Sequence, residues 1–201
     1  MQDISVFSLI LSVLAVLVSL ITYFMEQVNH NPILLRRSVI KYDSSRKVPK
    51  KILDNAINAA IHAPNHFLTE PWRFYYCGPK MKDKLFELNN DKRKQFESVP
   101  CWMVVTMASK YNLNDKLYQE EISACACSVQ NFMLSLASEG VGSKWVTGAL
   151  GIEETSILKL LDVDSTEKFL GVIWFGYPEK SLESQKPPER KLGKDMFKIL
   201  E

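Results

Sequence analysis

Two of the chain's three histidines, His62 and His66, stand four residues apart in the stretch HAPNHFLTEPWRFYYCG. On a regular helix this spacing puts two imidazoles on one face, where they can bind a metal. Pro64 lies between them, and proline disfavours helical geometry in the residue before it and lacks a backbone donor. The sequence therefore predicts no metal site here. The alternative to a functional role for His62 is a solvent-facing histidine at a helix end.

A second group of residues able to do chemistry is Arg36-Arg37-Ser38. Two adjacent guanidiniums and a hydroxyl form a set of forked donors that suits a phosphate. The alternative is an exposed basic helix end that complements the helix dipole. Two more polar groups remain outside the predicted core, namely Lys144–Gly148 (KWVTG) and the tail around Arg190.

The rest of the chain predicts the elements that hold these groups. From Pro49, apolar residues recur at three- and four-residue spacing, which predicts a helix that ends near Ala63. The further expected elements are a strand over 72–77, a helix over 79–89, a buried strand over 101–108, a long helix over 118–139, a loop or short strand over 141–151, a short helix over 153–161 and a buried strand over 169–178. This order predicts an α+β fold.

The N-terminal stretch from Ile4 to Phe24 carries no charge. At about 1.5 Å per residue, a helix of this length spans roughly the 30 Å of a bilayer core. We therefore expect a transmembrane anchor over residues 1–25, a connector over 26–33 and a folded domain over 34–201. A cleaved signal peptide is the alternative, but the start has no basic residue and no clear cleavage site. The basic residues that follow the stretch predict a membrane-bound protein with its folded domain in the cytosol.

Charge and cysteine content narrow the function further. The formal net charge of +2 is too small to indicate nucleic-acid binding, and no stripe of interleaved arginines and aromatics is present. Cys77 and Cys101 lie in apolar, strand-like runs and are expected to be buried thiols. Cys125 and Cys127 point to different faces of the long helix, so they neither bridge nor chelate easily.

Several motifs taken together resemble the nitroreductase family of flavoenzymes. The motifs are RRSV before the helix that begins at Pro49, AP and TEPW leading into a strand, GVGSKWVTG, and GYP followed by ERK in the tail. The resemblance covers residues 34–197. TEPW and the expected membrane anchor are particularly similar to the iodotyrosine deiodinase branch of the family, whereas the compact size is more similar to small bacterial nitroreductases. It implies a central, mostly antiparallel sheet flanked by helices, here preceded by the expected transmembrane helix.

The resemblance also implies an FMN enzyme that uses NADH or NADPH, forms a homodimer and reduces a small-molecule acceptor. The expected FMN-binding residues are Arg36, Arg37, Ser38, His62, Asn65, His66, Trp145, Val146, Thr147 and Arg190. Phe67 falls where the family places substrate against the flavin. Thr147 is the residue expected to modulate the flavin, through a donor near its reactive nitrogen. The flavin carries the chemistry in such enzymes, while the protein binds and orients it.

One position departs from the family pattern. Ile40 stands where an arginine usually follows the serine by two residues, with Lys41 after it.

The main functional hypothesis is a ping-pong reductase of nitro- or quinone-type acceptors. The alternatives are a deiodinase-like reductive dehalogenase and a membrane protein that binds flavin without turnover. The segment between Gly78 and Pro100 is too short for both a helix and the lid of a deiodinase.

Overall fold

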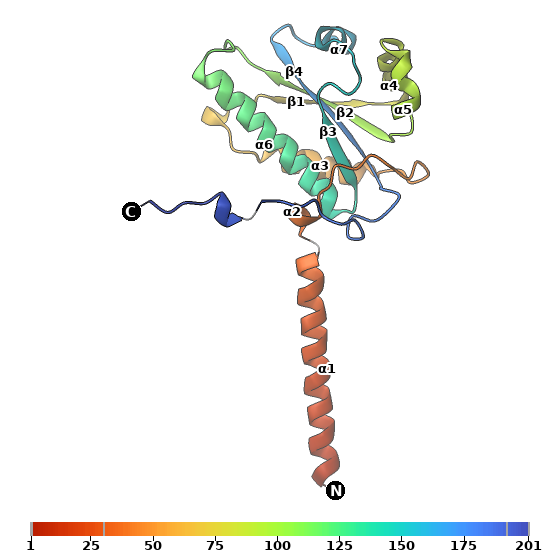
Figure 1. Ribbon diagram of the computed structural model, residues 1–201, viewed down its shortest axis with the longest axis vertical. Coiled ribbons are helices and arrows are strands. Elements are labelled where there is room, and N and C mark those ends of the chain that lie inside the picture. The colour runs from red at the N-terminus through yellow and green to blue at the C-terminus, as the bar shows by residue number, and fades with distance from the viewer. Residues whose placement is uncertain (1, 30, 192, 201) are drawn as a thin grey trace.

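A four-stranded antiparallel sheet between two layers of helices forms the body of the protein (Figure 1). The computed structural model describes the backbone of residues 2–29, 31–191 and 193–200, and the side chains of residues 8–22, 31–191, 193 and 195–200. The elements are α1 (Gln2–Asn29), α2 (Pro32–Leu35), α3 (Lys50–Ile61), η1 (His66–Leu68), β1 (Trp72–Cys77), α4 (Pro79–Glu87), η2 (Asn90–Lys92), α5 (Arg93–Phe96), β2 (Cys101–Ala108), α6 (Lys116–Ser138), β3 (Gly142–Val146), α7 (Glu154–Leu161), β4 (Glu167–Gly176) and η3 (Gly193–Asp195).

The strands lie in the order β1-β2-β4-β3, and each neighbouring pair is antiparallel. The central strand β2 is buried along almost its whole length because helices cover both faces of the sheet. A bulge between Val105 and Thr106 shifts the register of β2 against β4. Gly171 lies beside this bulge with a φ of 135°, and a side chain there would meet the indole of Trp145.

Side chains alternate between the two faces of the strands, and this alternation divides the core. Met103, Val105 and Phe132 belong to the layer between the sheet and helices α3 and α6. Trp102 and Val104 face the other way, toward Leu85 of α4. The α+β fold and the helices flanking the sheet agree with the sequence-based prediction.

The sequence predicts a transmembrane anchor over residues 1–25, and the structure corrects this prediction. Within the described residues, no helix is long and apolar enough to cross a membrane. The predicted membrane location is therefore wrong.

Candidate active site

The segment that carries Arg36 and Ser38 runs along the free edge of β3. Ser38 forms a parallel bridge with Ser143, and the backbone N–H of Val39 donates to the Ser143 carbonyl over 3.1 Å. Gly142 permits this close approach, because a Cβ atom there would lie 2.4 Å from Cγ2 of Val39. The glycine of the GVGSKW motif therefore positions the arginine segment against the sheet.

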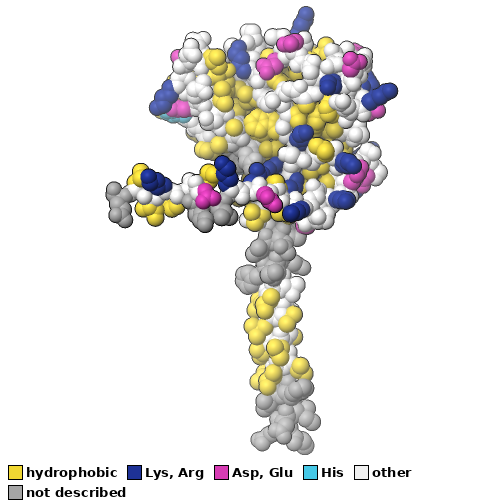
Figure 2. Space-filling model, viewed as in Figure 1, with side chains coloured by type: hydrophobic (Ala, Val, Ile, Leu, Met, Phe, Trp, Pro, Cys, Tyr) yellow, Lys and Arg dark blue, Asp and Glu magenta, His cyan; other side chains and the backbone are white. Residues whose placement is uncertain are grey.

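Arg36 lies in a cluster of like charges. Its pKa is lowered, first by partial burial of the guanidinium and then by the positive charges of Arg190 and Arg37. None of the ion pairs between described residues includes any of these three arginines. Figure 2 shows lysine and arginine side chains gathered at the end of the domain where α1 and the tail meet it. Because like charges repel one another, an anion bound in this cluster would be strongly favoured.

Arg37 points away from the position expected for a ligand. Its Nη1 donates to the carbonyls of Leu34 and Arg36, the second over 3.1 Å. The guanidinium therefore caps the C-terminal end of α2. In an extended segment, neighbouring side chains point to opposite sides, so Arg36 and Ser38 share one side while Arg37 faces the other.

Ser143 is a candidate site residue that the sequence motifs did not single out. Its side chain is buried, and its hydroxyl has no hydrogen-bond partner within the described part of the protein. A buried hydroxyl without a partner is costly, and this one lies on the strand next to Ser38. The sequence signal that could have found it is its place two residues before Trp145 in GVGSKWVTG.

The KWVTG stretch consists of the last residues of β3 and the two residues that follow, and it lies beside the arginine segment. The Trp145 indole N–H donates to the Leu170 carbonyl over 3.0 Å, which fixes the ring at the edge of the sheet. Val146 is buried in the core, so only its backbone can face a ligand. The Thr147 side chain is exposed and follows directly after the end of β3.

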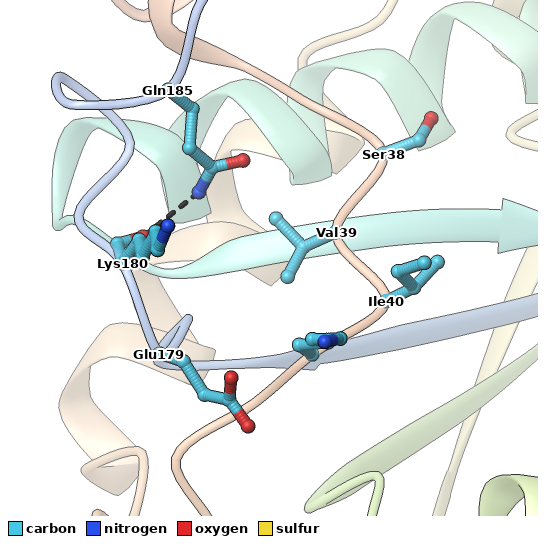
Figure 3. A pocket seen from close by; sticks show the side chains of 7 residues that line it. Ser38, Val39, Ile40, Glu179, Lys180 and Gln185 are labelled. Atoms are coloured by element: carbon cyan, nitrogen blue, oxygen red, sulfur yellow. Dashed lines mark hydrogen bonds between the residues drawn. The ribbon is translucent and has the colours of Figure 1, made fainter.

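A pocket of about 300 Å³ lies between residues 38–41 and the loop of residues 179–185. In Figure 3 the side chains of Ser38 and Ile40 extend from one side of the segment and that of Val39 from the other. The Gln185 amide donates to the Lys180 carbonyl over 2.8 Å and closes one wall. Ile40, at the usual arginine position, is 67% exposed. The side of the segment that carries Ser38 therefore has one cation fewer than the family pattern provides.

The histidine loop contains the second group of predicted site residues. His62 is exposed and forms the C-cap of α3. The Asn65 side chain is engaged within the loop: its amide donates to the Ala63 carbonyl over 3.2 Å and its oxygen accepts from the Glu70 N–H over 2.9 Å. Phe67 is 82% exposed. The loop therefore presents a wide apolar surface that the chain itself does not cover.

The two groups of predicted site residues lie near opposite ends of α6. His66 contacts Glu120, in the second turn of the helix. The strand β3, which borders Arg36 and Ser38, begins just after the other end of α6, where Figure 1 also places α2. Ser138 lies 18 positions after Glu120, which corresponds to roughly 27 Å of helix. Within one chain, the loop and the arginine segment therefore lie near opposite ends of α6.

Two buried carboxylates elsewhere in the fold were not predicted. The buried Glu167 carboxylate accepts hydrogen bonds from Tyr75 over 2.7 and 2.9 Å and from the Thr106 hydroxyl. On α6, Glu121 is buried, and its Oε2 has no partner among the described residues. Neither carboxylate lines the pocket beside Ser38.

The sheet, the flanking helices and the basic edge of β3 together define an α+β protein suited to bind an anionic ligand. The nitroreductase family model matches residues 33–177, and the chain belongs to that family.

Sequence relatives are distant but cover most of the chain. YfhC of Bacillus subtilis, whose name assigns it provisionally to the NAD(P)H nitroreductases, is 24% identical over 183 residues, which are 80% of this chain and 92% of that protein. Iodotyrosine deiodinase 1 of the rat is 38% identical over only 63 residues, which are 31% of this chain and 22% of the deiodinase. The similarity to the deiodinase is therefore local.

Solved structures share the fold. A nitroreductase-like family protein from Bacillus cereus superposes with a TM-score of 0.72 at 24% identity, covering 86% of this chain and 96% of that one. A provisionally named nitroreductase from Exiguobacterium sibiricum, solved in complex with FMN, superposes with a TM-score of 0.70 at 16% identity, covering 85% of this chain and 96% of that one. The similarity to the nitroreductase fold that the sequence motifs indicated is confirmed.

Proposed function

We propose that the protein is an FMN-dependent NAD(P)H oxidoreductase that reduces a small nitro- or quinone-type acceptor. The observation that carries this proposal is the arginine cluster without carboxylate partners at the edge of β3. Arg36, Ser38 and Arg190 would bind the FMN phosphate and the ribityl chain, while Arg37 supports the segment by capping α2.

The flavin ring would lie along the end of β3. The exposed Thr147 and the backbone around Val146 are available there as donors, while the Trp145 indole is held in place by Leu170. Bound FMN would supply the two-electron chemistry, accepting electrons from NADH or NADPH and passing them to the acceptor. The residues of the chain bind the phosphate, orient the ring and keep one face free for the two substrates in turn.

We further propose a homodimer in which each site takes its two walls from different copies. The separation of roughly 27 Å along α6 supports this, because it keeps the histidine loop away from the arginine cluster of its own chain. The exposed side chains of Phe67 and Leu68 also need a covering partner. In this arrangement His62, His66 and Phe67 of one copy face the flavin held by the other copy.

A reductive dehalogenase is the second candidate, because of the local similarity to iodotyrosine deiodinase 1. In the deiodinase branch, a lid supplies groups that hold an amino-acid substrate. Here residues 79–100 fold into α4, η2 and α5, and Leu85 and Phe86 are buried in the core of the domain. Since this segment is occupied in packing against the sheet, the nitro- or quinone-type reductase is favoured.

Titration of the protein with FMN and with riboflavin, followed by flavin fluorescence, tests the proposed phosphate site. Removing one charged hydrogen bond costs about 1.5–3 kcal/mol, so Arg36→Ala should weaken FMN binding by about 10- to 100-fold. Riboflavin binding should change little, because riboflavin lacks the phosphate. Arg46→Ala is the matched control, since it also removes a guanidinium and Arg46 stacks on the Tyr177 ring. Equal losses for both ligands would contradict the assignment of the phosphate site.

A further inference from the structure

The histidine loop is held in an unusual backbone conformation. Phe67, Leu68 and Glu70 have φ angles of 52°, 53° and 44°. These values lie in the left-handed region, which costs residues with a side chain on the order of 1 kcal/mol or more each. Such a conformation persists only where surrounding contacts impose it.

A single side-chain hydrogen bond ties this loop to α6. Among the described residues, the bond between His66 Nδ1 and Glu120 Oε2 is the one that joins residues 64–70 to that helix. A carboxylate only accepts, so Nδ1 must carry the hydrogen. This hydrogen bond, together with the charges of His66 and Lys116, holds the pKa of Glu120 below its ordinary value despite the opposing effect of desolvation. Glu120 is therefore ionised around neutral pH.

The same histidine supports the exposed aromatic side chain next to it. The His66 and Phe67 rings stack with their centroids 4.0 Å apart and an interplanar angle of 29°. The position of the Phe67 ring thus depends on the orientation of His66, which in turn depends on Glu120. Lys116 is the other charged group near this carboxylate, with its Nζ 3.7 Å from Glu120 Oε1.

We propose that Glu120 is a positioning residue that, through His66, fixes the Phe67 ring as a stacking wall for flat aromatic acceptors. This inference rests on the proposed function, in which the loop faces the flavin of the second copy. Glu120 touches neither flavin nor acceptor. Its effect falls on aromatic acceptors, which need the Phe67 ring in a fixed place.

The test compares two acceptors in Glu120→Ala and Glu120→Gln. A nitroaromatic acid needs a stacking wall, whereas ferricyanide takes electrons without stacking. In Glu120→Ala we expect the KM for the nitroaromatic to rise five- to tenfold, with ferricyanide turnover and FMN affinity changed less than twofold. Glu120→Gln keeps an acceptor oxygen and should show a smaller rise. Asp54→Ala is the matched control, because it removes a carboxylate from the exposed Lys50–Asp54 pair.

Histidine NMR supplies a readout that does not depend on turnover. The chain has three histidines, so the His66 ring nitrogens can be assigned with His66→Asn. We expect an Nδ1-protonated ring whose signal shifts in Glu120→Ala and stays in place in Asp54→Ala. An unchanged nitroaromatic KM, or equal losses with ferricyanide, would overturn the inference. A wild-type protein that binds no FMN would overturn the proposed function itself, and the histidine signal would still report whether the tie exists.

Discussion

Ser38 and Ser143 lie side by side in a parallel bridge that places the arginine segment at the free edge of β3. The two residues are far apart in the sequence but adjacent in the fold, because Gly142 lets Val39 pack directly against the strand. The proposed phosphate site therefore depends on a backbone contact as much as on its cationic side chains.

Gly142→Ala tests this contact. The new methyl group would lie 2.4 Å from Val39 Cγ2, so either the strand or the arginine segment must shift. Overpacking of this kind costs about 1–3 kcal/mol. We expect a lower unfolding temperature and weaker FMN binding, measured by calorimetry and fluorescence titration. Gly78→Ala is the control, because a Cβ atom at residue 78 would meet no other atom within 4 Å. Equal behaviour of the two variants would argue against the role of Gly142.

We expect substitutions of Arg36 and Arg37 to change different quantities, namely FMN affinity for Arg36 and the free energy of unfolding for Arg37. Arg37 caps α2 through two backbone carbonyls, so Arg37→Ala should lower the free energy of unfolding by about 1 kcal/mol. Its FMN affinity should change less than threefold. Arg36→Ala should do the reverse, losing affinity with little loss of stability. Urea denaturation of the flavin-free proteins gives the first quantity, and a loss of FMN affinity in Arg37→Ala as large as in Arg36→Ala would contradict the assignment.

If each site combines the arginine segment of one copy with the histidine loop of the other, variants of these two parts should complement each other in a mixed dimer. Arg36→Ala removes the phosphate contact of one chain, and Phe67→Asp places a charge on its loop. In a mixed dimer, one site takes both changes and the other takes neither. At an FMN concentration too low to load Arg36→Ala, mixing equal amounts of the two variants should therefore raise the activity to about a quarter of the wild-type value. No recovery, with mixed dimers shown to form by native mass spectrometry, would mean that each site is built within one chain.

The cysteines should differ sharply in reactivity. Burial raises the pKa of Cys77 to about 11 and that of Cys125 to about 12, with nearby Glu121 adding to the effect on Cys125. Cys127 is exposed. An aromatic disulfide reagent at pH 8 should therefore label one thiol quickly, identified by its loss in Cys127→Ser. Rapid labelling of a second thiol in the folded protein would contradict the burial of the others.

The same pKa shifts predict a loss of stability in alkali. A thiol whose pKa is raised in the folded state favours folding below its unfolded pKa, near 8.5–9, and this contribution falls as pH rises toward the folded value. The free energy of unfolding should fall by up to about 1.4 kcal/mol per pH unit for each such thiol between pH 9 and 11. In Cys125→Ala the fall should be shallower, and in Cys127→Ala it should match the wild type.

Local sequence patterns predicted most of the elements of the fold. Pro64 predicted that the helix before it ends near Ala63, and α3 ends at Ile61. The apolar run from Cys101 to Ala108 forms the buried strand β2. These predictions agree with the structure because helix punctuation and strand composition act over a few residues. The predicted membrane anchor was wrong: the uncharged length of the N-terminal stretch gave that prediction, whereas no helix among the described residues is long and apolar enough to cross a membrane.

The site was less predictable, because its contacts join distant parts of the chain. His66 and Glu120 are 54 residues apart, and nothing in the sequence around Glu120 marks it as a partner. Two features depend on how the arginine segment bridges to β3. They are the Arg37 guanidinium, which turns back onto its own backbone, and the Ser143 hydroxyl, which has no hydrogen-bond partner among the described residues. Sequence motifs placed the histidine loop and the arginine segment in one cofactor site. The length of α6 separates the two within one chain and led to the proposal that they come from different copies.

The most direct test of the central proposal is the visible spectrum of the purified protein with FMN, before and after anaerobic addition of NADH or NADPH. A flavin oxidoreductase should show the yellow absorption of bound FMN, which bleaches with at least one of the nucleotides and returns when a nitroaromatic or quinone is added. A protein that takes up no FMN, or whose bound flavin neither nucleotide reduces, would contradict the account.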